Sequence, residues 1–370
     1  MRRLRRHWQL AGSRCINAHS GTLLFEYSRA LEGPRYNGLV VELMDEKTVQ
    51  DFWQDHSCGD ALVGGLRDRF GGDYEKFFSD YDKFRYDMES HIPACLDGLG
   101  VSGKRVLEIG LGQGADSESL IRRGARWSGV DLTGESVERV RTRLTLRELP
   151  FDDLKQGSVL DLPFEDNSFD MVFSHGVLHH VPDIAGAQKE IYRVLRPGGE
   201  LVIMMYARWS LNYLVAIGLV RRAALLAAFP LAKAGLLKAD PDGGMLAAHL
   251  DNANKIGLGR YLRLKEFINY NTDGPGNPHA LVYDAKRIER DFPSFRVTRT
   301  YKRFMHAPPL PVHGLPGGNL MGWHLWAHLS PVGKTFTSAG QTATSTGSAA
   351  GKTATSAELA PPAERPDMVT

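Results

Sequence analysis

The stretch that most constrains this chain is a short apolar run that breaks into closely spaced glycines. Residues 104–109 (KRVLEI) have the aliphatic content of a buried parallel strand, and residues 116–123 have the composition of a helix. Between them, Gly110, Gly112 and Gly114 let the backbone turn sharply and approach a ligand where a Cβ would intrude. The sequence therefore predicts a nucleotide-binding turn between a strand and a helix.

This turn alone fits two classes of ligand. Gly110, Gly112 and Ala115 also match the G-x-G-x-x-G/A pattern of dinucleotide-binding proteins. Asp131 ends a second predicted strand (126–131), where a carboxylate holds the ribose of either class of ligand. On these residues alone, an NAD-dependent oxidoreductase or epimerase remains an alternative.

Motifs further along the chain separate the two classes. Glu108 extends the turn to E-x-G-x-G-x-G, and the sequence DLPF follows at 161–164. SFDMVFSHGVLHHVPD then stands at 168–183 and LRPGGELV at 195–202. This ordered set resembles the class I S-adenosylmethionine-dependent methyltransferases, within them the group that contains the quinone-biosynthesis and other small-molecule enzymes. The resemblance runs from about residue 104 to residue 206.

The resemblance implies S-adenosylmethionine as cofactor. The backbone of 110–114 would pack against its methionyl and ribose portion, and Glu108 would face its ammonium group. Asp131 would accept hydrogen bonds from the ribose hydroxyls, and Leu132 would flank the adenine. Many relatives carry Asp where this chain has Ser158. The full predicted cofactor site is Glu108, Gly110, Gly112, Gln113, Gly114, Asp131, Leu132, Ser158, Val159 and Ser174.

The residues after the fourth predicted strand bear on the methyl acceptor. Amine and nucleobase methyltransferases carry Asn or Asp followed by Pro-Pro there, whereas this chain has Ser174 and His175, which favours an oxygen or carbon acceptor. Histidine suits a general base near neutral pH, so His175 and His179 are the candidate catalytic residues, with His180 beside them. Because LHHVP is frequent in relatives with unlike substrates, a structural role for these histidines is the alternative.

The order of the elements predicts the fold class. Strands and helices alternate with short connections up to residue 206, which predicts a parallel sheet covered on both faces. The C-terminal strands at 295–304 and 322–329 look like a hairpin, as expected for a seventh strand inserted antiparallel beside the sixth. The expected fold is α/β, a Rossmann-like, seven-stranded, mostly parallel sheet with an antiparallel C-terminal strand. N-terminal helices and a helical insertion after strand five complete it.

Composition divides the chain into a basic extension (1–43), a methyltransferase domain (44–330) and a tail (331–370) that is expected to be disordered. The domain core would comprise 104–206 and 284–330 and enclose the insertion at 207–283. The extension is expected to be poorly ordered; a transit peptide, or translation from Met44, are the alternatives. Aromatic residues at helical spacing between 74 and 84 predict an amphipathic helix. The resemblance to class I methyltransferases implies that this helix lies over the cofactor cleft. It would bring Arg85 and Tyr86, with Trp53, to the methionine end of the cofactor.

The insertion contains an apolar stretch at 211–237 that Arg221, Arg222, Pro230 and Lys233 interrupt, so we expect neither half to span a bilayer of about 20 helical residues. Three interpretations remain: a lid over the substrate pocket, a dimer interface, or an interfacial helix that meets a membrane surface.

Charge and cysteine content limit the partners. The net charge of +2 is the small difference between 45 basic and 43 acidic residues, so no global field favours nucleic acid, and a small molecule is the expected partner. Cys15, Cys58 and Cys95 have neither metal-ligand spacing nor a disulfide framework, so we predict no metal site and a cytoplasmic location. The predicted activity is methyl transfer to a small, apolar acceptor. A cofactor-binding module without transfer activity is the non-enzyme alternative.

Overall fold

The computed structural model describes residues 45–55, 70–237 and 244–334. The predicted basic extension (1–43) and nearly all of the predicted tail (331–370) lie outside the described residues. Cys95 is the one cysteine among them, and its thiol is buried and free.

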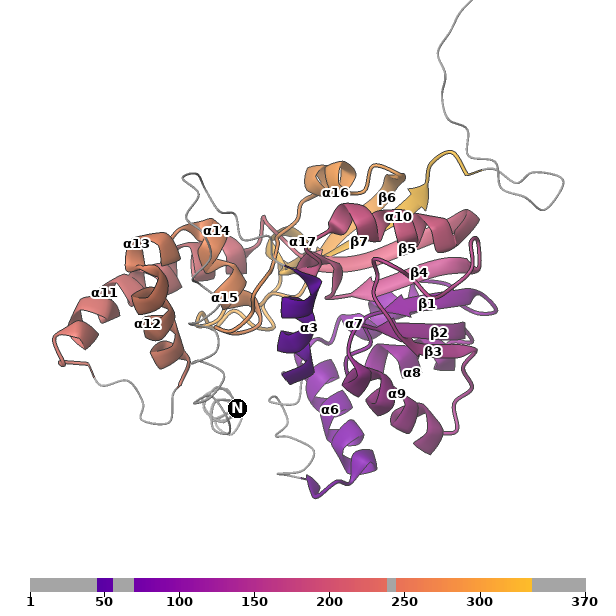
Figure 1. Ribbon diagram of the computed structural model, residues 1–370, viewed down its shortest axis with the longest axis horizontal. Helices are drawn as coiled ribbons and strands as arrows, with labels where there is room; N and C mark the ends of the chain where they lie inside the picture. The colour runs from indigo at the N-terminus through magenta and orange to yellow at the C-terminus, as the bar shows by residue number, and fades with distance from the viewer. Residues whose placement is uncertain (1–44, 56–69, 238–243, 335–370) are drawn as a thin grey trace, which may run out of the picture. The chain divides into compact units, whose positions relative to one another are not determined.

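A seven-stranded sheet in the order β3-β2-β1-β4-β5-β7-β6 forms the centre of the fold (Figure 1). Its strands are β1 (Arg105–Ile109), β2 (Arg126–Asp131), β3 (Asp153–Gln156), β4 (Phe169–His175), β5 (Leu195–Tyr206), β6 (Phe295–Arg303) and β7 (His324–Pro331). The first five strands pair in parallel, whereas β7 is antiparallel to both β5 and β6. The predicted fold class is confirmed.

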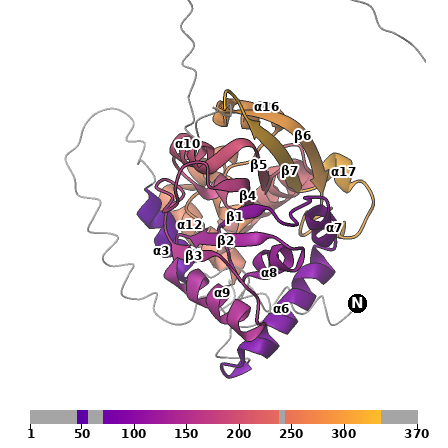
Figure 2. The same ribbon diagram turned by 90° about the vertical axis from the view of Figure 1, so that its right-hand side faces the viewer.

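Helices cover both faces of this sheet (Figure 2). One face packs against α7 (Ile92–Asp97), α8 (Ala115–Arg122) and α9 (Gly134–Leu146), and the other against α10 (Ile184–Val194) and α16 (Ala285–Asp291). Val106 and Leu107 are adjacent on β1 and fully buried, yet they belong to the cores on opposite faces. A strand that is buried on both faces needs a continuous apolar run, which is the pattern seen at 104–109.

Before α7 in the chain come α3 (Glu46–Asp55) and α6 (Tyr74–Met88). The predicted aromatic stripe is the buried face of α6, where Phe77, Phe78 and Tyr81 are buried. Asp73 begins this helix because its side chain accepts a hydrogen bond from the backbone N–H of Lys76.

The start of β5 differs from the prediction. Pro197, Gly198 and Gly199 predict a turn that ends a helix and starts a strand at 199. The observed strand begins earlier, at Leu195. Leu195 pairs with Phe169, and the register then shifts so that Glu200 pairs with Met171. Pro197 falls within this irregularity, where a sheet tolerates a residue without an N–H. The predicted turn is thus absorbed into the strand.

The insertion after β5 is helical, as predicted, and has a core of its own. It contains η2 (Asn212–Arg221), α11 (Arg222–Lys233), α12 (Met245–Ile256), α13 (Leu258–Tyr261), α14 (Leu264–Phe267) and α15 (Asn269–Thr272). Ile217, Leu225, Leu250 and Phe267 are buried in this core together with Trp323, which precedes β7. A short helix, α17 (Gly318–Met321), lies in the loop between β6 and β7.

The predicted interruption of the apolar stretch was wrong. Residues Asn212–Lys233 form one continuous helix of 22 residues, π-helical at first, with Pro230 inside it. Arg221 fits because its guanidinium turns to the carbonyl of Pro308, with Nε–O and Nη2–O distances of 2.9 Å and 2.6 Å. By length and composition alone this helix is able to cross a membrane, a test that core helices of soluble proteins also pass; 17% of its most apolar window is buried.

Candidate active site

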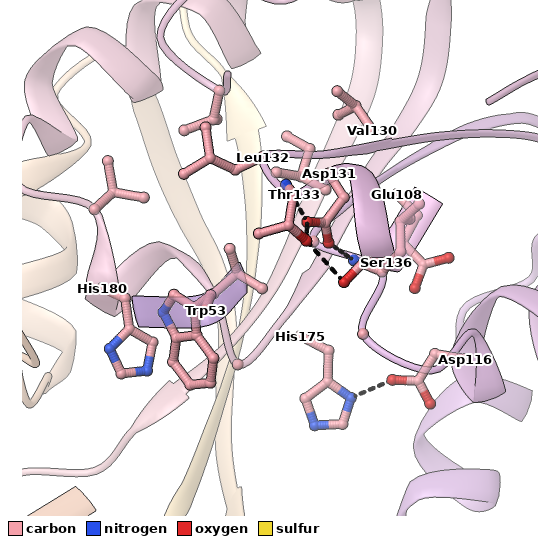
Figure 3. Close-up of a pocket in the computed structure, with 18 of the residues that line it drawn as sticks. Trp53, Glu108, Asp116, Val130, Asp131, Leu132, Thr133, Ser136, His175 and His180 are labelled. Carbon is pink, nitrogen blue, oxygen red and sulfur yellow. Dashed lines mark hydrogen bonds and ion pairs between the residues drawn. The ribbon is translucent and has the colours of Figure 1, made fainter. Parts of the chain in front are cut away.

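A pocket lies where the carboxyl ends of the parallel strands meet the N-terminal helices (Figure 3). Its walls are the loops that follow β1, β2, β3 and β4, together with residues of α3 and α6. The predicted site residues that line it are Glu108, Gly110, Gly112, Gln113, Asp131, Leu132, Val159 and His175. Those that lie outside its lining are Gly114, Ser158, Ser174 and His179. Most of the predicted residues are therefore together at one rim of the sheet.

The turn after β1 uses the backbone freedom of its glycines. Gly110, Gly112 and Gly114 have φ values of 78°, 51° and 76°, in the left-handed region where a side chain strains the backbone. A Cβ on Gly110 would lie 2.2 Å from Cγ2 of Val177. Gly114 precedes α8, and a Cβ there would lie 3.0 Å from Val140. Packing within the protein thus requires the first and third glycines, whatever ligand the pocket takes.

Asp131, at the end of β2, ties the glycine turn to the loop that follows. Its Oδ2 accepts a hydrogen bond from the N–H of Leu111 at 2.7 Å, and its Oδ1 accepts from the N–H and the hydroxyl of Thr133, both at 2.8 Å. Burial raises the pKa of Asp131, while these donors act in the opposite direction. Asp131 also lines the pocket, so the residue that holds the turn is part of the pocket wall.

Glu108 contributes a buried carboxyl group to the same wall. Its side chain accepts a hydrogen bond from the indole N–H of Trp127 at 2.8 Å. Burial raises the pKa of Glu108 to about 8, and the negative charge of Asp116 adds to this rise. The carboxyl group is therefore largely protonated at neutral pH, and a cation that enters the pocket would favour its ionised form.

His175, at the end of β4, is paired with Asp116, at the start of α8 (Figure 3). Nδ1 of His175 lies 2.7 Å from Oδ2 of Asp116 and 3.3 Å from Nη2 of Arg85, which donates to the same Oδ2 at 2.8 Å. Burial by itself raises the pKa of Asp116, but Arg85 and His175 outweigh it and hold that pKa below its usual range. An ionised carboxylate only accepts hydrogen bonds, so Nδ1 carries a proton, and in the neutral ring Nε2 holds a lone pair.

The hydroxyl groups of the two predicted serines make hydrogen bonds to other parts of the protein. The hydroxyl of Ser158 contacts the carboxylate of Glu46 and accepts a hydrogen bond from the N–H of Leu160 at 2.9 Å. The hydroxyl of Ser174 donates to the carbonyl of Ile109 at 3.1 Å. Both serines therefore stabilise the loops around the pocket without lining it.

The three histidines after β4 are divided by their surroundings. His175 and His180 line the pocket, whereas His179 is 0% exposed and packs against Tyr206, with ring centroids 4.0 Å apart. His180 meets the ring of Trp53 edge to face at the far end of the pocket (Figure 3). Of the two predicted catalytic histidines, His175 is thus the one in the pocket.

Residues 107–203 match the family model described as a methyltransferase domain. The chain carries a methyltransferase domain. The matched segment begins in β1 and ends within β5, so it includes the glycine turn, Asp131 and the three histidines after β4.

Curated proteins match a similar portion of the chain. The chain is 38% identical over 104 residues to a "Phthiotriol/phenolphthiotriol dimycocerosates methyltransferase 1" of Mycobacterium ulcerans. The aligned segment covers 28% of this chain and 37% of that protein. The chain is 41% identical over 101 residues to a "Fatty-acid O-methyltransferase" of Mycolicibacterium smegmatis (27% and 36%). A "Ubiquinone biosynthesis O-methyltransferase" of Alkalilimnicola ehrlichii is 33% identical over 128 residues (34% and 51%). The chain thus spans between about a third and a half of these relatives.

The pocket of the methyltransferase domain also contains residues that sequence reasoning did not assign. These include Asp116, Thr133, Ser136 and Val177. Trp53 and Arg85 line the pocket, as predicted. Tyr86 does not line it, and its hydroxyl donates a hydrogen bond to the carbonyl of Ala115 at 3.2 Å. An acidic residue directly after the glycine turn was the available signal for Asp116.

Proposed function

We propose that this chain is an S-adenosylmethionine-dependent methyltransferase that transfers the methyl group to an oxygen or carbon atom of a small, apolar organic acceptor. The observation that carries the proposal is the gathering of the glycine turn, Asp131, Glu108 and the His175–Asp116 pair in one pocket of the methyltransferase domain. An NAD-dependent oxidoreductase has no support, because β7 runs antiparallel between β5 and β6 where a dinucleotide fold would continue in parallel.

The pocket offers a partner for each recognisable part of the donor. Asp131 would accept from the ribose hydroxyls, and the apolar side chains of Leu132 and Val159 would flank the adenine. Glu108 and Asp116 would face the ammonium group with negative charge. Oδ1 of Asp116 is buried and has no hydrogen-bond partner among the described residues, and such an acceptor calls for a donor from a ligand. When bound, S-adenosylmethionine supplies an electrophilic methyl group.

The insertion and the relatives both favour an apolar acceptor. The names of the relatives refer to phthiotriol dimycocerosates, a fatty acid and ubiquinone biosynthesis. Asp273, from the insertion, lies 3.3 Å from Nε2 of His180, which lines the pocket, so we assign the insertion as a lid on the acceptor side. Its long apolar helix exposes several leucines suited to a membrane surface, namely Leu214, Leu219, Leu226 and Leu231. The cytoplasmic location stays a prediction.

His175 is the proposed general base for an oxygen acceptor. Its Nδ1–H is held by Asp116 and its Nε2 keeps a lone pair, so the ring is oriented to take a proton from the acceptor as the methyl group is transferred. Asp116 acts through His175 and is a positioning residue in this scheme. The remaining task of the pocket is to exclude water and hold donor and acceptor in line.

Calorimetric titration of the full chain tests the donor and the role of Asp131 together. We expect S-adenosylhomocysteine to bind and NAD not to bind. Asp131→Ala should weaken this binding about 10- to 100-fold, about 1.5 to 3 kcal/mol, because hydrogen bonds to a charged group are lost. Asp152→Ala is the control, since Asp152 pairs with Arg126 at the opposite end of β2 and should leave the affinity unchanged. Binding of NAD alone, or equal affinity in both variants, would contradict the proposal.

Methyl transfer itself is tested with radiolabelled S-adenosylmethionine and a panel of phenols, quinols, fatty acids and prenylated acceptors. We expect product from at least one apolar acceptor and none from amines of similar size. Donor binding without transfer to any member of the panel would favour the non-enzyme alternative, a cofactor-binding module.

Glu108 should make donor binding depend on pH. The pKa of Glu108 is raised to about 8 by burial and by Asp116, so the group is protonated below pH 8 and must lose its proton to pair with an ammonium group. Affinity for S-adenosylhomocysteine should therefore rise between pH 6 and about 7.5, by up to about tenfold per unit. Titrations in buffers of different ionisation enthalpy should show proton release. Glu108→Gln should abolish both effects; a pH-independent affinity in the parent chain would rule out this role.

A further inference from the structure

A second cluster of polar side chains lies beside the pocket, between the core and the insertion. His179 and His180 come from η1 (Leu178–His180), directly after β4, and Asp273 follows α15 of the insertion. One potential ligand atom from each residue lies within 4.8 Å of the other two. Both histidines are buried, and the Asp273 side chain is 21% exposed.

His179 lacks the hydrogen bonds that a buried imidazole needs. The residue is 0% exposed, and neither Nδ1 nor Nε2 has a hydrogen-bond partner within the described part of the chain. A buried polar atom left unpaired is destabilising, and more than nine in ten buried polar groups in proteins are paired. Because the ring carries two such atoms, its burial calls for a bound group that the protein does not itself supply.

His180 points to the nature of that group. Its Nδ1 lies 2.6 Å from the carbonyl oxygen of His279, which only accepts, so Nδ1 carries a proton. In the neutral ring, Nε2 then holds a lone pair directed at Oδ2 of Asp273, another acceptor, at 3.3 Å. Two acceptors repel at this distance unless Nε2 carries a proton or a metal cation lies between them. A histidine whose other N–H is held by a backbone carbonyl is also the usual arrangement of a metal ligand.

We propose that His179, His180 and Asp273 bind one divalent transition-metal ion, with Zn²⁺ as its representative. Two imidazoles and one carboxylate select zinc, cobalt, nickel or iron over magnesium or calcium, which prefer oxygen ligands. Ligand atoms about 2.1 Å from one ion in tetrahedral geometry lie about 3.4 Å apart, which the His180–Asp273 pair already satisfies at 3.3 Å. The distances that involve His179 are at most 4.8 Å, so its ring would have to move by up to about 1.4 Å to complete the site.

The ion would fasten the insertion to the core at the edge of the pocket. Tyr206, the last residue of β5, donates its hydroxyl to Oδ1 of Asp273 at 2.6 Å, which orients the carboxylate. A metal ligand held in this way is oriented before the ion arrives. Metal binding at this site needs no methyl donor, so it can be tested independently of the proposed methyl transfer.

Zinc binding by the full chain, prepared without an affinity tag, tests the site. The chain is treated with a chelator, dialysed, and titrated with Zn²⁺, and with Co²⁺ as a spectroscopic probe. We expect about one ion per chain, a visible Co²⁺ spectrum of nitrogen and oxygen ligation, a higher Tm with Zn²⁺, and no competition from excess Mg²⁺.

Variants decide whether these residues are the ligands. His179→Gln and Asp273→Asn should each weaken Zn²⁺ binding by about 100-fold or more, since loss of an outer partner alone costs 10- to 100-fold. Asp273→Asn retains an oxygen for the Tyr206 hydroxyl, and circular dichroism without metal checks that it folds. His249→Gln is the control, because His249 is hydrogen-bonded to Tyr261 within the insertion and should leave binding unchanged.

Two outcomes would overturn the proposal. One is that the parent chain takes up no stoichiometric Zn²⁺, as expected if His180 and Asp273 form an imidazolium–carboxylate pair that needs no metal. The other is that both ligand variants bind Zn²⁺ as tightly as the parent, which would place the ion elsewhere in the chain.

Discussion

Replacing His175 with alanine is expected to slow methyl transfer by about 10²- to 10⁴-fold while donor affinity changes by less than about threefold. The imidazole is held by the 2.7 Å hydrogen bond from Nδ1 to Asp116, with Nε2 left to accept a proton. Removing the ring deletes the base but leaves the carboxylates of Glu108 and Asp131 in the pocket. Single-turnover rates with a phenolic acceptor, together with calorimetric affinity for S-adenosylhomocysteine, measure the two quantities separately.

A second histidine–carboxylate pair provides the matched control. Nδ1 of His328, on β7, lies 2.8 Å from Glu200 on β5, and neither residue lines the pocket, so His328→Ala should leave the rate unchanged. Asp116→Asn keeps the shape of the positioning residue but removes its charge; it should slow transfer and alter the pH profile. A loss below about threefold in His175→Ala would mean that proximity alone drives transfer and that the histidine is structural.

The sheet could be predicted because each parallel strand carries its own signal. A strand buried on both faces is a short apolar run, and the glycine turn, DLPF and LRPGG mark the ends of such runs. The predicted strands at 104–109 and 126–131 agree with β1 and β2 within one residue at each end. β5 is the exception, because the irregularity at Pro197 depends on pairing with Phe169 and Met171, which local sequence does not encode.

The continuous helix of the insertion was missed for a similar reason. From the sequence alone, Arg221 and Arg222 look like interruptions, because burying a guanidinium group within an apolar helix is energetically costly. In the structure Arg222 donates to the carbonyl of Leu262, and Arg221 reaches Pro308 in the loop between β6 and β7. These carbonyls come from distant segments, so the accommodation is tertiary.

The site was predicted where one segment supplies the function and missed where two segments combine. Glu108 is next to last in β1 and Asp131 is last in β2, and both line the pocket because their strands end there. Asp116 becomes part of the pocket through Arg85 of α6, a residue 31 positions earlier in the chain. The choice between His179 and His180 depends on which way each ring of η1 projects, and two adjacent identical residues carry no signal for it.

Replacing Gly110 with alanine is expected to destabilise the protein by about 2 to 5 kcal/mol. Its φ of 78° is left-handed, which costs a residue with a Cβ about 1 to 2 kcal/mol. The new Cβ would also lie 2.2 Å from Cγ2 of Val177, and overpacking of this kind costs about 1 to 3 kcal/mol. Urea denaturation followed by circular dichroism measures the change in the free energy of unfolding.

Backbone strain and the collision with Val177 can be measured separately, because another glycine of the chain has a left-handed φ but no neighbouring atom that a Cβ would meet. Gly103 has a φ of 73° and nothing within 4 Å of the position that a Cβ would take, so Gly103→Ala should cost only the backbone strain of about 1 to 2 kcal/mol. Adding Val177→Ala to Gly110→Ala removes both colliding methyl groups and should recover part of the loss. If Gly110→Ala were no more destabilising than Gly103→Ala, the turn would have shifted to make room for the added methyl group. The requirement for glycine at this position would then come from the ligand.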